Sequence, residues 1–257
     1  MKLVVLVTGA TSGIGAGIAS RFLHEGHKVI MTGRRIPRIE EFKRSLTSSK
    51  QDNLYISSLD ITNNAESKLF VERIPEEFKD IDVLVNNAGL ALGLEPAYEA
   101  EISEWDQMID TNIKGLVNMT NLLLPRMIEL SRGHIFNIGS VAGTYPYPGG
   151  NVYGASKAFV HEYTSELRLS LRGTSIRVTS IEPGMVSGTE FSNVRLRDDD
   201  KVGKVYEGIH AMSADDIAEA IYWSASLPPH VSINRLELMP VQQGFSSPQF
   251  HREIAKK

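Results

Sequence analysis

The sequence predicts a single α/β domain built on a doubly wound, open parallel sheet with helices on both faces. Short apolar runs rich in Val, Ile and Leu alternate with longer helical patterns along the 257 residues, which is the element order of parallel α/β sheets. Glycine or polar clusters directly follow most of these runs, as turns at the carboxyl ends of parallel strands do. No repeat, low-complexity tract or Pro/Ser-rich linker divides the chain, so one domain is expected for 1–257.

Seven strands are expected, because seven apolar or β-branched runs end at turn residues. The first run, Lys2–Val7, shows no polar alternation, which is typical of a strand buried on both faces. The runs cover residues 2–7, 28–32, 54–59, 81–85, 134–138, 175–181 and 236–239.

Helical periodicity predicts a helix from the glycines after the first strand to residue 24, a charged helix over 37–46, and others over 66–73, 105–130, 153–171 and 214–227. The 105–130 helix should be interrupted near Pro125, since proline removes a backbone hydrogen bond. Residues 192–212 form a long charged connection, and we expect it to be a lid over the substrate.

The composition excludes several function classes. The chain has 27 basic and 31 acidic residues, so its charge does not favour a nucleic-acid or anionic-membrane partner. It has no cysteine, which excludes disulfides, thiolate catalysis and cysteine-bound metal, and its seven histidines lack metal-ligand spacing. No apolar run is long enough for a signal segment or a membrane span, so we expect a cytoplasmic protein without a metal site.

Six polar or glycine clusters fall directly after predicted strands. In an open parallel sheet, ligands bind outside the carboxyl ends of the strands, so these clusters predict one binding site at that edge. The preference of strand-to-helix turns for Gly, Asn and Asp explains some clusters, but not the polar helix start that lies beyond one of them. The clusters are Gly9–Gly15, Gly33–Arg35, Asp60, Asn86–Gly89, Ser140 and Pro183–Gly184.

That helix start carries Tyr153 and Lys157, four residues apart and therefore on one helix face. A nearby ammonium is expected to lower the pKa of a phenol from its ordinary value of about 10. A phenol tuned in this way can exchange a proton with an alcohol or ketone near neutral pH. The alternative is a solvated Tyr–Lys pair on the surface of an amphipathic helix.

The first cluster has glycines at 9, 13 and 15, spaced G-x-x-x-G-x-G between a strand and a helix. Such a turn lets a dinucleotide pyrophosphate approach the N-terminus of the helix, where free N–H groups favour anions. A purely structural glycine turn is the alternative.

The end of the second strand indicates which nicotinamide cofactor binds. NAD sites usually have a carboxylate there for the ribose 2′-hydroxyl, but this chain has Gly33 followed by Arg34 and Arg35. Guanidinium groups pair well with a 2′-phosphate, so the sequence predicts NADP. A solvated basic helix start is the alternative.

The remaining clusters complete the predicted site. Ser140 should donate to the substrate oxygen, and Lys157 should also hold the nicotinamide ribose. Asn112 should retain a water that links Lys157 to solvent, although a buried Asn that is bonded to helix backbone is an equal alternative. Asn86, at the end of its strand, could equally be a structural hydrogen bonder. Adenine should lie beside Asp60 and Ile61, and its ribose beside Asn87, Ala88 and Gly89.

Together these residues resemble the short-chain dehydrogenase/reductase family. The likeness rests on Thr8–Gly15, Asn86–Gly89, Asn112, Ser140, Tyr153-x-x-x-Lys157 and Pro183–Gly184, in this order. It implies a Rossmann-type seven-stranded sheet, a homotetramer, and hydride transfer between nicotinamide C4 and a carbinol carbon. It also implies roles: Tyr153 as acid/base, Ser140 as positioner of the carbonyl, Lys157 as tuner and ribose anchor, and Asn112 as holder of the proton relay.

The same likeness implies further cofactor contacts, and one departure from the family pattern. Many NADP-using members have a basic residue where this chain has Ser12, so specificity should rest on Arg34 and Arg35. The further contacts implied are Thr11, Ser12, Ile14, Pro183, Gly184, Val186 and Thr189, beside the glycines of the first turn.

Segments 86–93, 149–154 and 188–195 look like the NADP-dependent 3-hydroxy acid dehydrogenases within that family. That likeness implies oxidation of a small 3-hydroxy acid such as serine, L-allo-threonine or 3-hydroxypropionate, or reduction of malonic semialdehyde. A carboxylate substrate needs a cation, and Arg195 and Arg197 follow the last cluster. We hypothesise that Arg195 binds the carboxylate; a solvated loop arginine is the alternative. Other functions left open are a carbonyl or 3-oxoacyl-thioester reductase and a non-catalytic NADP sensor.

Overall fold

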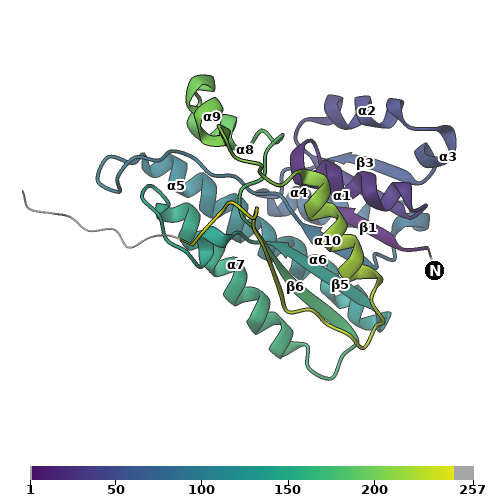
Figure 1. The fold of residues 1–257 in the computed structure, drawn as a ribbon. Helices are drawn as coiled ribbons and strands as arrows, with labels where there is room; N and C mark the ends of the chain where they lie inside the picture. Colours follow the sequence, from purple (N-terminus) through teal and green to yellow (C-terminus); the bar gives the residue numbers. More distant parts are fainter. Residues whose placement is uncertain (1, 246–257) are drawn as a thin grey trace, which may run out of the picture.

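Buried aliphatic runs form a seven-stranded parallel sheet in the order β3-β2-β1-β4-β5-β6-β7 (Figure 1). The computed structural model describes residues 2–245, except the side chains of 199 and 201, so residues 1 and 246–257 of the predicted domain lie outside it. The strand order confirms the predicted seven-stranded parallel sheet, and the direction in which strands are added reverses between β1 and β4. The strands are β1 Val4–Val7, β2 Lys28–Gly33, β3 Leu54–Ser58, β4 Val83–Asn86, β5 Gly133–Ile138, β6 Ile176–Pro183 and β7 Arg235–Leu238.

Helices cover both faces of this sheet, as the doubly wound prediction requires. Their bounds differ from the expected ones by a few residues, and the short α3 was not expected. They are α1 Gly13–His24, α2 Ile36–Ser45, α3 Ser48–Gln51, α4 Asn64–Glu72, α5 Ile102–Ile109, α6 Leu116–Glu129, α7 Asn151–Ser170, α8 Phe191–Leu196, α9 Asp199–Tyr206 and α10 Ala214–Ser226, with the 3₁₀ turns η1 Glu76–Phe78 and η3 Val141–Gly143 and the π turn η2 Asp110–Gly115.

Alternate residues of β1 enter two different hydrophobic cores. Val5 and Val7 pack with Phe22 of α1 and Ile221 of α10 on one face, whereas Leu6 belongs to the core on the other face. Successive strand side chains point to opposite faces, so an uninterrupted apolar run is required where both faces are covered. This two-sided burial fixes the register that brings the strand ends to one edge.

The predicted interruption near Pro125 is wrong. α6 passes through Pro125 without a break, and the irregular turn is η2, which lies between α5 and α6. A proline costs one backbone hydrogen bond, but Met119, Leu123 and Met127 bury one face of α6 in the core. That packing keeps the helix continuous through the proline.

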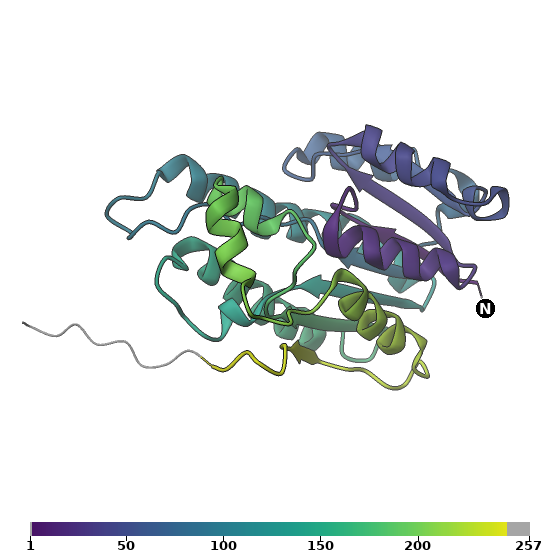
Figure 2. The same ribbon diagram turned by 45° about the horizontal axis from the view of Figure 1, so that its top comes forward.

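The segment expected as a lid contains structure of its own. Most of it forms α8 and α9, and Met212 then pairs with Val186 in an isolated parallel bridge. Figures 1 and 2 show α8 and α9 at the end of the sheet away from the labelled N-terminus, where the strands end. Within residues 2–245, no helix is long and apolar enough to cross a membrane.

Candidate active site

Tyr153 and Lys157 lie on the buried face of α7, near its start. Their exposed fractions are 7% and 6%, so they are not a solvated surface pair. The Lys157 ammonium lies 5.8 Å from the centre of the Tyr153 ring and donates to the carbonyl of Ile138 at 2.8 Å. Ile138 ends β5, so this bond fixes the lysine against the carboxyl edge of the sheet.

The charge environment differs from the expected one. Burial raises the pKa of Tyr153 to about 12, while a hydrogen bond with Ser140 and the charge of Arg195 act to lower that pKa. Burial also lowers the pKa of Lys157 to about 8. The pKa of the phenol is therefore raised, and not lowered as expected, because desolvation dominates. The ammonium of Lys157 is directed to a backbone carbonyl.

Ser140 lies two residues after the end of β5 and caps the short turn η3. Its Oγ accepts from the amide of Ala142 at 3.1 Å and lies 3.3 Å from the carbonyl of Pro183, to which it can donate. The hydroxyl also interacts with the Tyr153 phenol. Two hydroxyl groups thus meet at the sheet edge, where one oxygen of a ligand can contact both.

Asn112 lies in the π turn, and its amide is fully engaged with neighbouring segments. Its Oδ1 accepts from Leu90 N at 2.9 Å, and its Nδ2 donates to Leu90 O at 2.9 Å and to Ser156 Oγ at 3.0 Å. The side chain is 1% exposed. Asn112 therefore ties the segment after β4 to α7, and its partners are a loop backbone and a side-chain hydroxyl, not helix backbone.

Asn86 and Asn87 are both structural hydrogen bonders. The Asn86 amide donates to Thr120 and Asn137 inside the core. The Asn87 amide donates to the carbonyls of Thr8 and Gly9 at 2.9 and 3.1 Å. Asn87 thus holds the glycine-rich turn in place, a role that its position after β4 did not reveal.

The glycine-rich turn passes too close to its neighbours for side chains. Gly9 has a positive φ of 65°, and a Cβ there would lie 2.7 Å from the Cα of Ala88; a Cβ on Gly15 would lie 2.4 Å from Nδ2 of Asn87. Ser12 is the N-cap of α1, but its side chain makes no capping hydrogen bond. The first amides of α1 are therefore left for an anion, and the turn fits a dinucleotide pyrophosphate.

The end of β2 has a partner that the sequence did not reveal. Arg35 Nη2 donates to Thr11 Oγ1 at 3.1 Å and to Ser12 Oγ at 3.0 Å. Glu190, which precedes α8, forms ion pairs with Arg35 at 2.7 Å and with Arg38 at 2.5 Å. Arg35, with Ser12 and Arg38, lowers the pKa of Glu190 to about 2. A carboxylate does therefore reach this place, although it comes from a distant segment.

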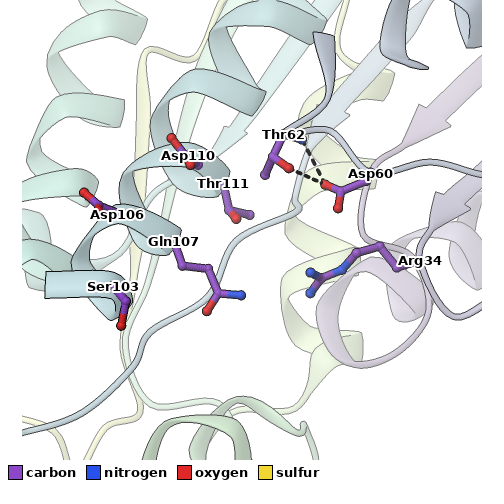
Figure 3. A pocket seen from close by; sticks show the side chains of 8 residues that line it. All are labelled: Arg34, Asp60, Thr62, Ser103, Asp106, Gln107, Asp110 and Thr111. Atoms are coloured by element: carbon purple, nitrogen blue, oxygen red, sulfur yellow. Dashed lines mark hydrogen bonds between the residues drawn. The ribbon is translucent and has the colours of Figure 1, made fainter. Parts of the chain in front are cut away.

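Arg34 points the other way, into a cavity of about 360 Å³ between the end of β3 and helix α5 (Figure 3). Asp60 lies on one side of it and accepts from the amide and hydroxyl of Thr62. The side chain of Ile61 is buried against Gly115. Only Asp60 of this predicted adenine pair therefore presents its side chain to the cavity. The lining residues are Arg34, Asp60, Thr62, Ser103, Asp106, Gln107, Asp110 and Thr111.

Arg195 of α8 is partly buried over the phenol. Its guanidinium carbon lies 5.3 Å from the ring centres of both Tyr147 and Tyr153, and it donates to Gly93 O, Tyr147 Oη and Gly149 O. It is therefore not a solvated loop arginine. Arg197 is 64% exposed and pairs with Glu104 at 2.8 Å, so the two arginines have different surroundings.

Phe191, Tyr147 and Gln243 also reach the site, and the sequence reasoning missed all three. The Phe191 ring lies 5.5 Å from that of Tyr153. Gln243 accepts from the amide of Met185 at 2.8 Å and would clash with a Cβ on Gly184. No local pattern marks these residues, because their approach depends on how distant loops fold back.

The other predicted contacts lie along the same edge. Thr189 faces Gly13, and Gly89 lies between the side chains of Asn112 and Lys157. Ile14 packs on the core behind the turn, as does Val186, and Ala88 borders the other core. Pro183 ends β6, and the amide of Gly184 donates to Leu238. No cluster of three or more His, Cys, Asp or Glu residues in 2–245 could hold a metal.

The chain is similar to several known proteins. A family model described as short chain dehydrogenase matches residues 3–200. The chain is 54% identical over 252 residues to the NADP-dependent 3-hydroxy acid dehydrogenase YdfG of Escherichia coli (strain K12), covering 98% of this chain and 100% of that one. It is 48% identical over 254 residues to a serine 3-dehydrogenase of Rhizobium radiobacter, covering 98% and 100%.

Two solved structures are also similar. The closed form of serine dehydrogenase complexed with NADP⁺ superposes with a TM-score of 0.94 at 54% identity, over 97% of this chain and 99% of that one. Serine dehydrogenase from Escherichia coli superposes with a TM-score of 0.83 at 50% identity, over 94% and 99%.

Proposed function

This chain belongs to the short chain dehydrogenase family, and we propose that it oxidises the 3-hydroxyl group of a small 3-hydroxy acid with NADP, or catalyses the reverse reduction. The substrates proposed are serine, L-allo-threonine and 3-hydroxypropionate, with malonic semialdehyde in the reducing direction. The observation that carries this proposal is the guanidinium of Arg195, held 5.3 Å from the ring centre of the buried Tyr153. This guanidinium can pair with the carboxylate of a substrate beside the Tyr153 phenol, which can donate a proton.

NADP is the cofactor, and its nicotinamide ring accepts a hydride during oxidation and donates one during reduction. The fit of the chain to its phosphates rests on the crowded glycine turn at Gly9 and Gly15 and on the uncapped start of α1. Arg34 and Arg35 are proposed to hold the 2′-phosphate, since the end of β2 is Gly33, without a carboxylate of its own. Lys157 is proposed to hold the nicotinamide ribose.

Tyr153 is proposed to exchange the proton with the substrate oxygen, and Ser140 to position that oxygen. With a pKa of about 12, the phenol is protonated at neutral pH, so it is ready to donate to a carbonyl oxygen during reduction. During oxidation the proton of the substrate alcohol passes to the phenolate form of Tyr153, and Ser140 and Arg195 favour that form because both lower the pKa of the phenol. Asn112 acts as a positioning residue, through the loop at Leu90 and through Ser156.

The surroundings of Tyr153 favour a small acid over an acyl-thioester. Arg195 and Phe191 lie against the phenol, and Tyr147 packs on the cluster of side chains that includes Tyr153. Arg195 also bridges the loops at Gly93 and Gly149. A thioester with a long acyl chain would need an apolar channel in place of this cation. The segment 192–212 is proposed as the lid, since α8 supplies Arg195.

We also propose a homotetramer that is built partly on the outer face of α7. On that face Phe159 is 38% exposed and stacks on Tyr163, with ring centres 5.8 Å apart, and Leu169 is 64% exposed. Aromatic and aliphatic side chains of this kind are typical of homo-oligomer interfaces. Light scattering after size-exclusion chromatography measures the mass; a monomer at micromolar concentration would contradict this part of the proposal.

The test of the activity is an initial-rate screen. NADP reduction is measured with serine, L-allo-threonine and 3-hydroxypropionate, and NADPH oxidation with malonic semialdehyde and a 3-oxoacyl-thioester, with NAD(H) in parallel. We expect activity with the small acids and a strong preference for NADP(H). Activity confined to the thioester would replace the proposal with the reductase alternative. Tight NADPH binding with no turnover of any substrate would favour the sensor.

A further inference from the structure

Glu190 connects two segments that are far apart in the sequence. It lies between Thr189 and the first residue of α8, and its carboxylate reaches Arg35 and Arg38 at the start of α2 with ion-pair distances of 2.7 and 2.5 Å. The side chains of the two arginines are 46% and 47% exposed, and that of Glu190 is 34% exposed. The contact therefore closes the segment before α8 over the cofactor edge of the sheet.

The carboxylate of Glu190 occupies cations that the 2′-phosphate of the cofactor would also use. Arg35 also donates to Thr11 and Ser12, so its guanidinium lies directly beside the glycine-rich turn. That is where the proposed function requires it to hold a 2′-phosphate. A phosphate monoester carries about −1.5 to −2 charges at neutral pH, so it and a carboxylate would repel each other there.

We propose that Glu190 is an internal competitor of the cofactor's 2′-phosphate for Arg35 and Arg38. This inference rests on the proposed function, since it assumes that NADP binds at this edge. The carboxylate neutralises the two guanidinium groups while the 2′-phosphate is absent, and the arriving phosphate displaces it from both of them. Glu190 therefore reduces the preference of the chain for phosphorylated over unphosphorylated cofactor.

The same contact links cofactor recognition to the proposed lid. Thr189 packs against Gly13 of the glycine-rich turn, and Phe191 and Arg195 on the other side of Glu190 contact the Tyr153 ring. Release of Glu190 frees the start of α8 from α2 while its far end stays near the phenol. The 2′-phosphate should thus loosen one anchor of this segment.

The experiment compares Glu190→Gln with the wild type and with a matched control, Glu104→Gln. Glu104 anchors the other end of α8 through Arg197 at 2.8 Å, so its variant also removes a carboxylate that holds this segment. Dissociation constants are measured for NADPH and NADH by nucleotide fluorescence, and for adenosine 2′,5′-bisphosphate and 5′-AMP by calorimetry. Amide hydrogen exchange of residues 190–206 is followed with and without the bisphosphate.

For Glu190→Gln we expect NADPH and the bisphosphate to bind about two- to tenfold more tightly, as the loss of a half-exposed competing ion pair allows. Binding of NADH and 5′-AMP should stay within about twofold, and Glu104→Gln should leave all four constants within about twofold. In the wild type, the bisphosphate should speed hydrogen exchange near residue 190. In Glu190→Gln that exchange should be fast from the outset.

Weaker NADPH binding by Glu190→Gln would overturn the inference, because Glu190 would then position the arginines for the phosphate. Equal changes for NADPH and NADH, or no change at all, would also overturn it. Arg35→Ala separates this failure from that of the proposed function. If Arg35→Ala weakens NADPH binding while Glu190→Gln is silent, only the competition is wrong; if Arg35→Ala is silent too, the proposed phosphate site is wrong.

Discussion

Replacing Arg195 by alanine tests the substrate assignment most directly. In the free protein this guanidinium donates to Gly93, Tyr147 and Gly149, and it lies over the Tyr153 ring. A charge-assisted hydrogen bond to a substrate carboxylate contributes about 1.5–3 kcal/mol. Its loss should lower kcat/KM for serine by about 10- to 150-fold.

The assay must separate this effect from damage to the loops that Arg195 holds together. Rates are therefore measured with pairs of substrates that differ only in the carboxylate: serine against 2-aminoethanol, and 3-hydroxypropionate against ethanol. Damage to the site lowers kcat/KM for both members of a pair, whereas loss of carboxylate binding lowers it for the acid alone. The quantity that decides is thus the ratio of the two values.

Arg197→Ala is the matched control, since Arg197 lies two residues further along and makes a partly exposed ion pair with Glu104. A pair near the surface contributes about 1 kcal/mol or less to stability, and its loss should leave the substrate ratio unchanged. The reasoning is refuted if Arg195→Ala remains folded and keeps the wild-type ratio of acid to alcohol.

Three further predictions concern the phenol, the buried lysine and the glycine turn. Tyr153→Phe should lower kcat by about 10²- to 10⁴-fold and leave NADPH affinity within about twofold in a fluorescence titration; retained turnover would remove Tyr153 from proton transfer. The pKa of Lys157 is about 8 in the folded chain, below the ordinary 10.5. Between pH 8 and 10.5 this lysine is therefore mostly protonated in the unfolded chain and mostly deprotonated in the folded chain. Urea unfolding at pH 7.5 and 10.5 measures the difference in free energy of unfolding between the wild type and Lys157→Met. This difference should rise by on the order of 3 kcal/mol from the lower to the higher pH. A flat or falling difference contradicts the burial of the ammonium. Gly9→Ala should cost roughly 2 kcal/mol or more of stability and weaken NADPH binding, because it adds a clash with Ala88 to a left-handed backbone. Gly26→Ala, with a φ of 81° and open space around it, should show the backbone cost alone; equal costs would show that the clash is relieved.

The strands and the glycine turn were accessible from sequence because they obey local rules. Uninterrupted aliphatic runs such as the one ending at Val7 identify strands that are buried on both faces. Gly9 and Gly13 both have a positive φ, which few other residues tolerate. The four-residue spacing of Tyr153 and Lys157 placed them on one helix face before any contact was known. The prediction failed at Pro125, where packing of α6 outweighed the local cost of the proline.

The sequence by itself therefore determined the sheet, the edge at which the polar clusters meet, and the residue types found there. Only the tertiary structure decided the charges that surround them. It buried Tyr153 enough to raise its pKa, turned Lys157 to the carbonyl of Ile138, and brought Arg195 and Glu190 from one short segment to opposite ends of the site. The reason is physical: periodicity and turn preferences act between near neighbours in the chain, whereas burial and Coulomb interactions depend on distances in space that only the folded chain fixes.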